Sequence, residues 1–113
     1  MEAREEDHAE LPLVLPLGGT VWYGVLDRLY RVGETWYLED YKTDREVRPE
    51  AYRLQLALYR EAVRQAWGLQ AEARLVYLRP REVHPFSPEE LRAALAEVAN
   101  PPGEAPGGEE GQA

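Results

Sequence analysis

Hydrophobic and polar positions along this chain follow a strand-like pattern first and a helix-like pattern later. Residues 11–17 are apolar but contain two prolines, so they favour an edge strand over a central one. Residues 20–32 and 35–42 are rich in valine, tryptophan, tyrosine and leucine. Because only a glycine and a glutamate separate these two segments, they predict an antiparallel hairpin.

Helical spacing begins after the hairpin. Apolar residues recur every three or four positions over residues 49–67, with a proline at the start and Gly68 at the end, which predicts a helix. Residues 73–79 predict a further strand. The sequence Ser-Pro-Glu-Glu at residues 87–90 is typical of a capping box and predicts a second helix to about Val98.

The order strand, strand, helix, strand, helix predicts an α/β domain with a mixed central β-sheet flanked by helices. The helical crossover is long enough to make strands 35–42 and 73–79 parallel. We expect this α/β domain to occupy residues 11–99. Residues 1–10 are interpreted as an acidic lead-in, and residues 100–113 as a disordered tail rich in proline, glycine and glutamate.

Composition excludes several classes of protein. The chain has no cysteine, so disulfides, thiolate zinc sites and iron–sulfur clusters are excluded. No apolar run approaches the roughly 18 residues that a membrane-spanning helix needs. The acidic beginning of the chain is unlike a signal peptide. We therefore expect a cytoplasmic protein with no membrane association.

The net charge of −8 at first argues against a nucleic-acid partner, because affinity for phosphates comes largely from basic residues. The distribution of charge changes this interpretation. Residues 11–100 hold 13 acids and 12 bases, so the predicted folded part is nearly neutral and the ends are acidic. Such a domain could act on DNA while another domain holds the DNA tightly.

Candidate chemistry lies near the ends of the two hairpin strands. Lys42 is the only lysine in the chain, and it follows Asp40 by two residues, so both side chains share one face of a strand. Asp27 lies late in the preceding strand, and hairpin partners lie roughly 5 Å apart. Two carboxylates this close favour a bound cation such as Mg²⁺. The lysine would then orient or deprotonate an attacking water, or stabilise an anionic transition state.

Three motifs together resemble a known family. They are Gly-Val-Leu-Asp-Arg-Leu at residues 24–29, Glu-Asp-Tyr-Lys-Thr-Asp at 39–44 and Gln-Leu-Ala-Leu-Tyr at 55–59. Their order and spacing resemble the RecB-like branch of the PD-(D/E)xK nuclease superfamily. They are most similar to the nuclease domain at the carboxyl end of AddA-type helicase–nucleases.

The resemblance implies a restriction-endonuclease-like core and a Mg²⁺- or Mn²⁺-dependent DNA nuclease of exonuclease type. Its partners would be DNA and a helicase domain or subunit, in the processing of DNA ends during double-strand break repair. Its implied site residues are Asp27 and Asp40 as catalytic metal ligands, the Tyr41 carbonyl as a further metal ligand, Lys42 as the catalytic lysine, and Gln55 and Tyr59 as DNA-binding and supporting residues.

Two features of the family have no counterpart in the sequence. Members usually carry a helix before the first strand, with a histidine or glutamate that reaches the metal. We expect this chain to lack that helix, and we do not assign the role to His8. Several AddA-type relatives also bind an iron–sulfur cluster through four cysteines, and the chain has none.

Other interpretations stay open at the level of sequence. The chain could be a catalytically inactive nuclease-fold module that serves DNA binding or scaffolding, or an interaction domain whose acidic ends contact a basic partner. Asp40 and Lys42 could form a surface ion pair worth about 0–1 kcal/mol. Gln55 and Tyr59 could equally be structural residues of the helix.

Overall fold

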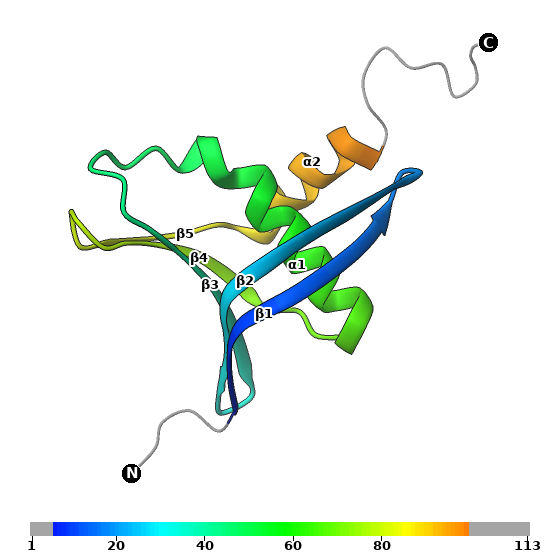
Figure 1. The fold of residues 1–113 in the computed structure, drawn as a ribbon, viewed down its shortest axis with the longest axis horizontal. Helices are drawn as coiled ribbons and strands as arrows, with labels where there is room; N and C mark the ends of the chain where they lie inside the picture. The colour runs from blue at the N-terminus through cyan, green and yellow to red at the C-terminus, as the bar shows by residue number, and fades with distance from the viewer. Residues whose placement is uncertain (1–5, 100–113) are drawn as a thin grey trace.

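The computed structural model describes residues 6–99, which form a mixed five-stranded sheet and two α-helices (Figure 1). The strands lie in sequence order across the sheet; β1, β2 and β3 are antiparallel, β3 and β4 are parallel, and β4 and β5 are antiparallel. The predicted α/β class with a mixed sheet is confirmed. The elements are β1 (Glu6–Leu17), β2 (Thr20–Val32), β3 (Thr35–Lys42), η1 (Pro49–Tyr52), α1 (Arg53–Trp67), β4 (Glu72–Tyr77), β5 (Glu82–Pro85) and α2 (Pro88–Ala99).

Local sequence signals set the end of α1 and the start of α2. Gly68 ends α1 in the left-handed conformation, with φ of 70°, and its N–H donates to the carbonyl of Arg64 at 2.8 Å. At the start of α2 the Ser87 N–H donates to Glu90 Oε1 at 2.9 Å, and the Glu90 N–H donates to Ser87 Oγ at 3.1 Å. The predicted capping box is therefore confirmed. Neither described helix combines the length and apolarity needed to cross a bilayer.

The first strand begins earlier than predicted. It starts at Glu6 rather than Leu11, so residues assigned to an acidic lead-in belong to the sheet from position 6 onward. The reason lies on the neighbouring strand, where Arg28 forms an ion pair with Asp7 and Arg31 lies 3.8 Å from Glu6. The predicted tail at residues 100–113 lies outside the described residues.

The strand β5 was not predicted. The predicted strand ends at Tyr77 rather than Arg79, and the chain then turns through residues 78–81 and returns antiparallel to β4. Arg81 has a positive φ of 60° in this turn. Because β5 has only four residues and lies at the edge of the sheet, it shows no long apolar alternation that a sequence pattern could reveal.

The core forms where the sheet packs against α1. Leu29, Leu38 and Leu75 from three strands are fully buried, and they belong to one cluster with Leu56 and Val63 of α1. The helix α2 packs beside α1 and contributes Leu91 to the same cluster. Residues that alternate with these leucines lie on the opposite face of the sheet.

The long hairpin of β1 and β2 curves along its length (Figure 1). The sequence places Tyr23, Val25, Asp27 and Leu29 on one face of β2, but only Leu29 is buried, whereas Tyr23 and Val25 are 77% and 52% exposed. Two-stranded ribbons twist strongly, so one face of a strand does not stay directed toward the core over its whole length. The outer half of this face of β2 is therefore exposed, whereas Leu29 at its inner end joins the core.

Candidate active site

Two carboxylates meet where the β2–β3 ladder ends. The last paired residues of this ladder on the site side are Arg28 and Glu39, and Asp27 and Asp40 are the next residue on each strand. The Asp27 Oδ2 accepts a hydrogen bond from the backbone N–H of Tyr41 at 2.8 Å. Asp27 is thereby fixed beside Asp40, as the hairpin register predicts.

The Asp40 carboxylate is buried, with only 4% of the residue exposed. Burial raises its pKa to about 6; the hydrogen bond with Asp27 adds to this rise, and the nearby Lys42 opposes it. The burial of Asp40 also excludes the alternative of a surface ion pair with Lys42, because a residue this buried does not lie at the surface.

Lys42 links the carboxylates to the helix α1. Its Nζ lies 2.9 Å from Asp40 Oδ2 and donates to Gln55 Oε1 at 3.0 Å. The same ammonium lies 4.2 Å from the centre of the Tyr52 ring, within the range of a cation–π contact. The predicted common face of Asp40 and Lys42 is therefore present, and three different contacts hold the ammonium in place.

The two motif residues of α1 continue this chain of contacts. Gln55 Nε2 donates to the Tyr59 hydroxyl at 3.3 Å, and that hydroxyl donates to the carbonyl of Val25 at 3.0 Å. Burial and the nearby Asp40 charge raise the pKa of Tyr59. Polar contacts thus run from Asp40 through Lys42, Gln55 and Tyr59 back to the strand that carries Asp27.

Gly24 permits the close approach of α1 to β2. A Cβ atom at this position would lie 2.9 Å from Cε1 of Tyr59, which is closer than real Cβ contacts allow. A glycine is therefore needed for the Tyr59 hydroxyl to reach the Val25 carbonyl. Sequence reasoning missed this role. Its only signal was that Gly24 opens the first motif, at residues 24–29.

Sequence reasoning also missed Tyr52, whose ring contacts the Lys42 ammonium. It precedes Gln55 by three residues and Tyr59 by seven, so the three side chains share one face of the helical segment. That spacing was a signal available in the sequence. Its hydroxyl donates to Asp44 Oδ2 at 2.5 Å, which raises the pKa of Tyr52 to about 12.

The carboxylates of Asp27 and Asp40 suit a hard divalent cation whose coordination shell the protein fills only in part. The Asp40 Oδ2 is buried and contacts Lys42, yet it receives no well-directed hydrogen bond. Across residues 6–99, no group of three or more histidine, aspartate or glutamate side chains is arranged to hold a metal. A pair of carboxylates suits Mg²⁺, which is often bound through one or two carboxylates and usually keeps several waters in protein sites.

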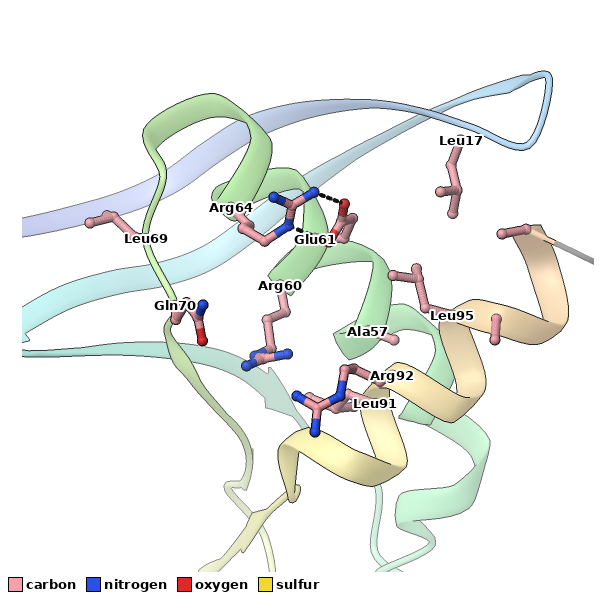
Figure 2. A pocket seen from close by; sticks show the side chains of 12 residues that line it. Leu17, Ala57, Arg60, Glu61, Arg64, Leu69, Gln70, Leu91, Arg92 and Leu95 are labelled. Carbon is pink, nitrogen blue, oxygen red and sulfur yellow. Dashed lines mark hydrogen bonds and ion pairs between the residues drawn. The ribbon is translucent and has the colours of Figure 1, made fainter.

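A cavity lies away from the carboxylates. It has a volume of about 360 Å³ and lies among α1, α2 and Leu17 of β1 (Figure 2). Leucine side chains and three arginines line it, and its carboxylate, Glu61, is bound by Arg64 at 2.8 Å. None of the predicted site residues lines this cavity, so cavity size and candidate chemistry point to different places. The carboxylates remain the candidate site because they are groups that can bind a cation.

A comparison with solved structures finds a relative of the same fold. The crystal structure described as "Putative exonuclease" from Eubacterium rectale superposes with a TM-score of 0.63 at 18% sequence identity. The match covers 81% of this chain and 41% of that one, so the chain spans less than half the length of this structural relative. No curated protein matches the chain in sequence.

A family model described as the PD-(D/E)XK nuclease superfamily matches residues 2–106, which include every predicted site residue. The match covers most of the sequence, and the mixed sheet agrees with the fold of the structural relative. This chain belongs to the PD-(D/E)XK nuclease superfamily.

Proposed function

We propose that this chain is a Mg²⁺- or Mn²⁺-dependent deoxyribonuclease domain that hydrolyses DNA phosphodiester bonds. The observation that carries the proposal is the meeting of Asp27, Asp40 and Lys42 at one place, with a buried Asp40 oxygen that lacks a well-directed hydrogen bond. Membership of a nuclease superfamily whose members generally use divalent metals supports it. Buried like charges are costly unless a cation or a proton lies between them, and a cation has a chemical use here.

In this proposal Asp27 and Asp40 hold the cation, and the carbonyl of Tyr41 completes the protein ligands. A bound divalent ion would lower the pKa of a water and neutralise charge on the scissile phosphate. The Lys42 ammonium, fixed by Asp40 and Gln55, orients the attacking water and stabilises the charge that develops on the phosphoryl oxygens.

Gln55 and Tyr59 would keep that ammonium in place and contact the DNA strand. Gln55 accepts from Lys42 and donates to Tyr59, so its amide is oriented by both neighbours. Tyr59 in turn is tied to the Val25 carbonyl. The expected effect of this arrangement is a lysine with little rotational freedom, which lowers the entropic cost of reaching the transition state.

The order of the three motifs supports a more specific assignment. We propose that the domain belongs to the RecB-like branch, most similar to AddA-type helicase–nucleases, where it would act as an exonuclease on DNA ends in double-strand break repair. Its partners would be DNA and a helicase domain or subunit, and its location cytoplasmic. The near-neutral charge of residues 11–100 supports the need for a separate DNA-holding partner.

A second candidate function is a nuclease-fold module without catalysis, which binds DNA or acts as a scaffold. The observation that favours it is the lack of a third acidic or histidine ligand at the carboxylate pair within residues 6–99. Calorimetric titration with Mn²⁺ separates the two functions. A nuclease should bind the ion and lose that binding in Asp27→Ala, whereas a scaffold should show no such binding.

The test of activity uses the full chain and end-labelled single- and double-stranded DNA with Mg²⁺ or Mn²⁺. Wild type is compared with Asp40→Ala, Lys42→Ala and the control Glu34→Gln, which lies exposed in the hairpin turn. We expect cleavage by wild type and the control, and losses of at least about 100-fold in the two site variants. Equal rates in all four proteins would reject the proposal.

A further inference from the structure

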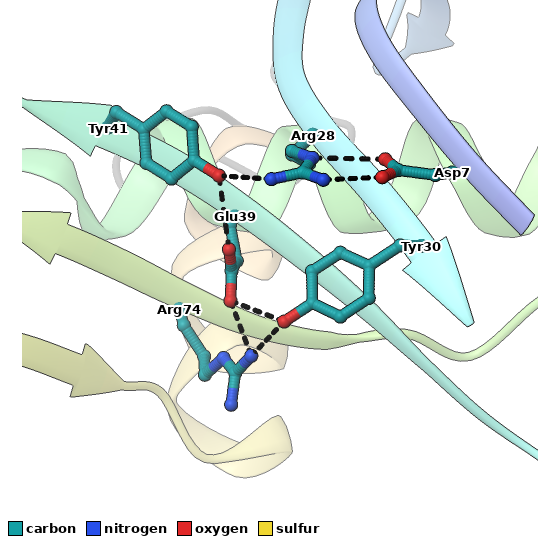
Figure 3. A network of polar contacts seen from close by, with 6 residues as sticks. All are labelled: Asp7, Arg28, Tyr30, Glu39, Tyr41 and Arg74. Carbon is teal, nitrogen blue, oxygen red and sulfur yellow. Dashed lines mark hydrogen bonds and ion pairs between the residues drawn. The ribbon is translucent and has the colours of Figure 1, made fainter. Parts of the chain in front are cut away.

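A polar network covers the face of the sheet opposite to the carboxylates. Arg28 on β2, Glu39 on β3 and Arg74 on β4 are register partners, so they form a row across three strands on one face. Aspartate and tyrosine side chains extend this row along the strands. Figure 3 shows the complete set: Asp7, Arg28, Tyr30, Glu39, Tyr41 and Arg74.

Three members of this network are sequence neighbours of the proposed site residues. Arg28 follows Asp27, Glu39 precedes Asp40, and Tyr41 lies between Asp40 and Lys42. Side chains alternate between the two faces of a strand, so these neighbours point away from the site. Any contact that fixes the backbone from the rear face therefore also fixes the site residues on the front face.

Tyr41 is held on both faces of the sheet. Its backbone N–H donates to Asp27 at 2.8 Å, and its hydroxyl accepts from Arg28 Nη1 at 3.2 Å. Both contacts join β3 to β2 beyond the Arg28–Glu39 pair, where the described ladder of these strands ends. They replace ladder pairing at the place where two carboxylates would otherwise drive the strands apart.

The network is anchored on the strands that flank β2 and β3. Arg28 forms two hydrogen bonds with Asp7 of β1. Glu39, which is buried, contacts Arg74 of β4 and accepts from the Tyr30 hydroxyl at 2.7 Å. The Tyr41 hydroxyl joins the two halves, because it also donates to Glu39 Oε1 at 3.4 Å.

We propose that the Tyr41 side chain, held by Arg28, is a positioning group that keeps Asp27 against Asp40 from the rear face of the sheet. This inference rests on the proposed function, because the positioned carboxylates are the proposed metal ligands. Loss of the hydroxyl leaves only the Tyr41 N–H to tie the strands at this point. The carboxylates then spend less time at the separation that binds a divalent ion, and affinity for the ion falls.

The chain offers a matched control for the test. Tyr37 lies on the same strand and the same face, stacks on Tyr30 and lies under Arg74, and its hydroxyl makes no hydrogen bond among residues 6–99. Wild type, Tyr41→Phe and Tyr37→Phe are titrated with Mn²⁺ by calorimetry, and their melting temperatures are measured in EDTA. We expect Mn²⁺ affinity to fall about tenfold in Tyr41→Phe and to stay within twofold in Tyr37→Phe.

A second variant tests the other end of the contact. Arg28→Lys keeps the charge opposite Asp7, but a single ammonium cannot bridge Asp7 and Tyr41 as the guanidinium does. It should weaken Mn²⁺ binding to a similar extent, and the double variant with Tyr41→Phe should bind no more weakly than the weaker single variant.

The outcomes separate this inference from the proposed function. Mn²⁺ binding by wild type with equal affinity in Tyr41→Phe overturns the positioning role and leaves the nuclease proposal standing. A lower melting temperature with unchanged affinity also overturns it, because the contact would then serve stability alone. If wild type binds no Mn²⁺, the nuclease proposal and this inference are both rejected.

Discussion

Replacing Asp40 with asparagine should stabilise the chain at neutral pH when divalent ions are removed. The pKa of Asp40 rises from 3.8 to about 6 in the fold, chiefly because the carboxyl is buried. Below pH 3.8 the group is protonated in both the folded and the unfolded chain, so it costs nothing. As pH rises from about 4 to about 6, the unfolded chain loses the proton first, and the folded state is destabilised.

The rise of roughly two pKa units sets the magnitude of the destabilisation by ionised Asp40. Each unit corresponds to about 1.4 kcal/mol, so ionised Asp40 costs the fold up to about 3 kcal/mol above pH 6. Asparagine has nearly the shape of the neutral acid and does not ionise. The advantage of Asp40→Asn over wild type should therefore be near zero at pH 4 and reach about 1–3 kcal/mol at pH 7.5.

Urea denaturation in EDTA at several pH values measures this difference in the free energy of unfolding. Glu34→Gln is the control, because Glu34 is exposed in the hairpin turn and its replacement should change stability by less than about 0.5 kcal/mol at every pH. The reasoning is refuted if Asp40→Asn is less stable than wild type at pH 7.5, or if its advantage does not grow with pH. A stabilised variant that has lost activity would show a carboxylate kept for chemistry at a cost in stability.

Three further outcomes are expected. Gly24→Ala places a Cβ against the Tyr59 ring and should cost about 1–3 kcal/mol in urea denaturation; an unchanged midpoint would contradict the close packing. Lys42→Arg keeps the charge but cannot fit a planar guanidinium into the ammonium's position beside Gln55, so DNA cleavage should fall at least about 100-fold, and activity within twofold of wild type would count against the proposed role. Ser87→Ala removes the capping box and should cost about 1 kcal/mol while Mn²⁺ affinity stays unchanged, as titration calorimetry can check; weaker Mn²⁺ binding would show that α2 is coupled to the site.

The sequence by itself determined the local elements of this protein. Alternation and turn residues gave the hairpin of β2 and β3, and helical spacing with Gly68 gave the end of α1. These signals depend on contacts within a few residues, so they can be found without knowing the rest of the fold. The common face of Asp40 and Lys42 and the one-turn spacing of Gln55 and Tyr59 follow from the same local periodicities.

Only the tertiary structure decided which of these elements meet. The contact of Gln55 with Lys42 depends on where α1 crosses the sheet, and that in turn depends on the glycine at position 24. Likewise the early start of β1 depends on arginines of β2, which lie more than twenty positions further along the chain. Local patterns carry no information about such distant partners, because the same alternation fits a strand in any register. The burial that raises the pKa of Asp40 is a property of the assembled fold for the same reason.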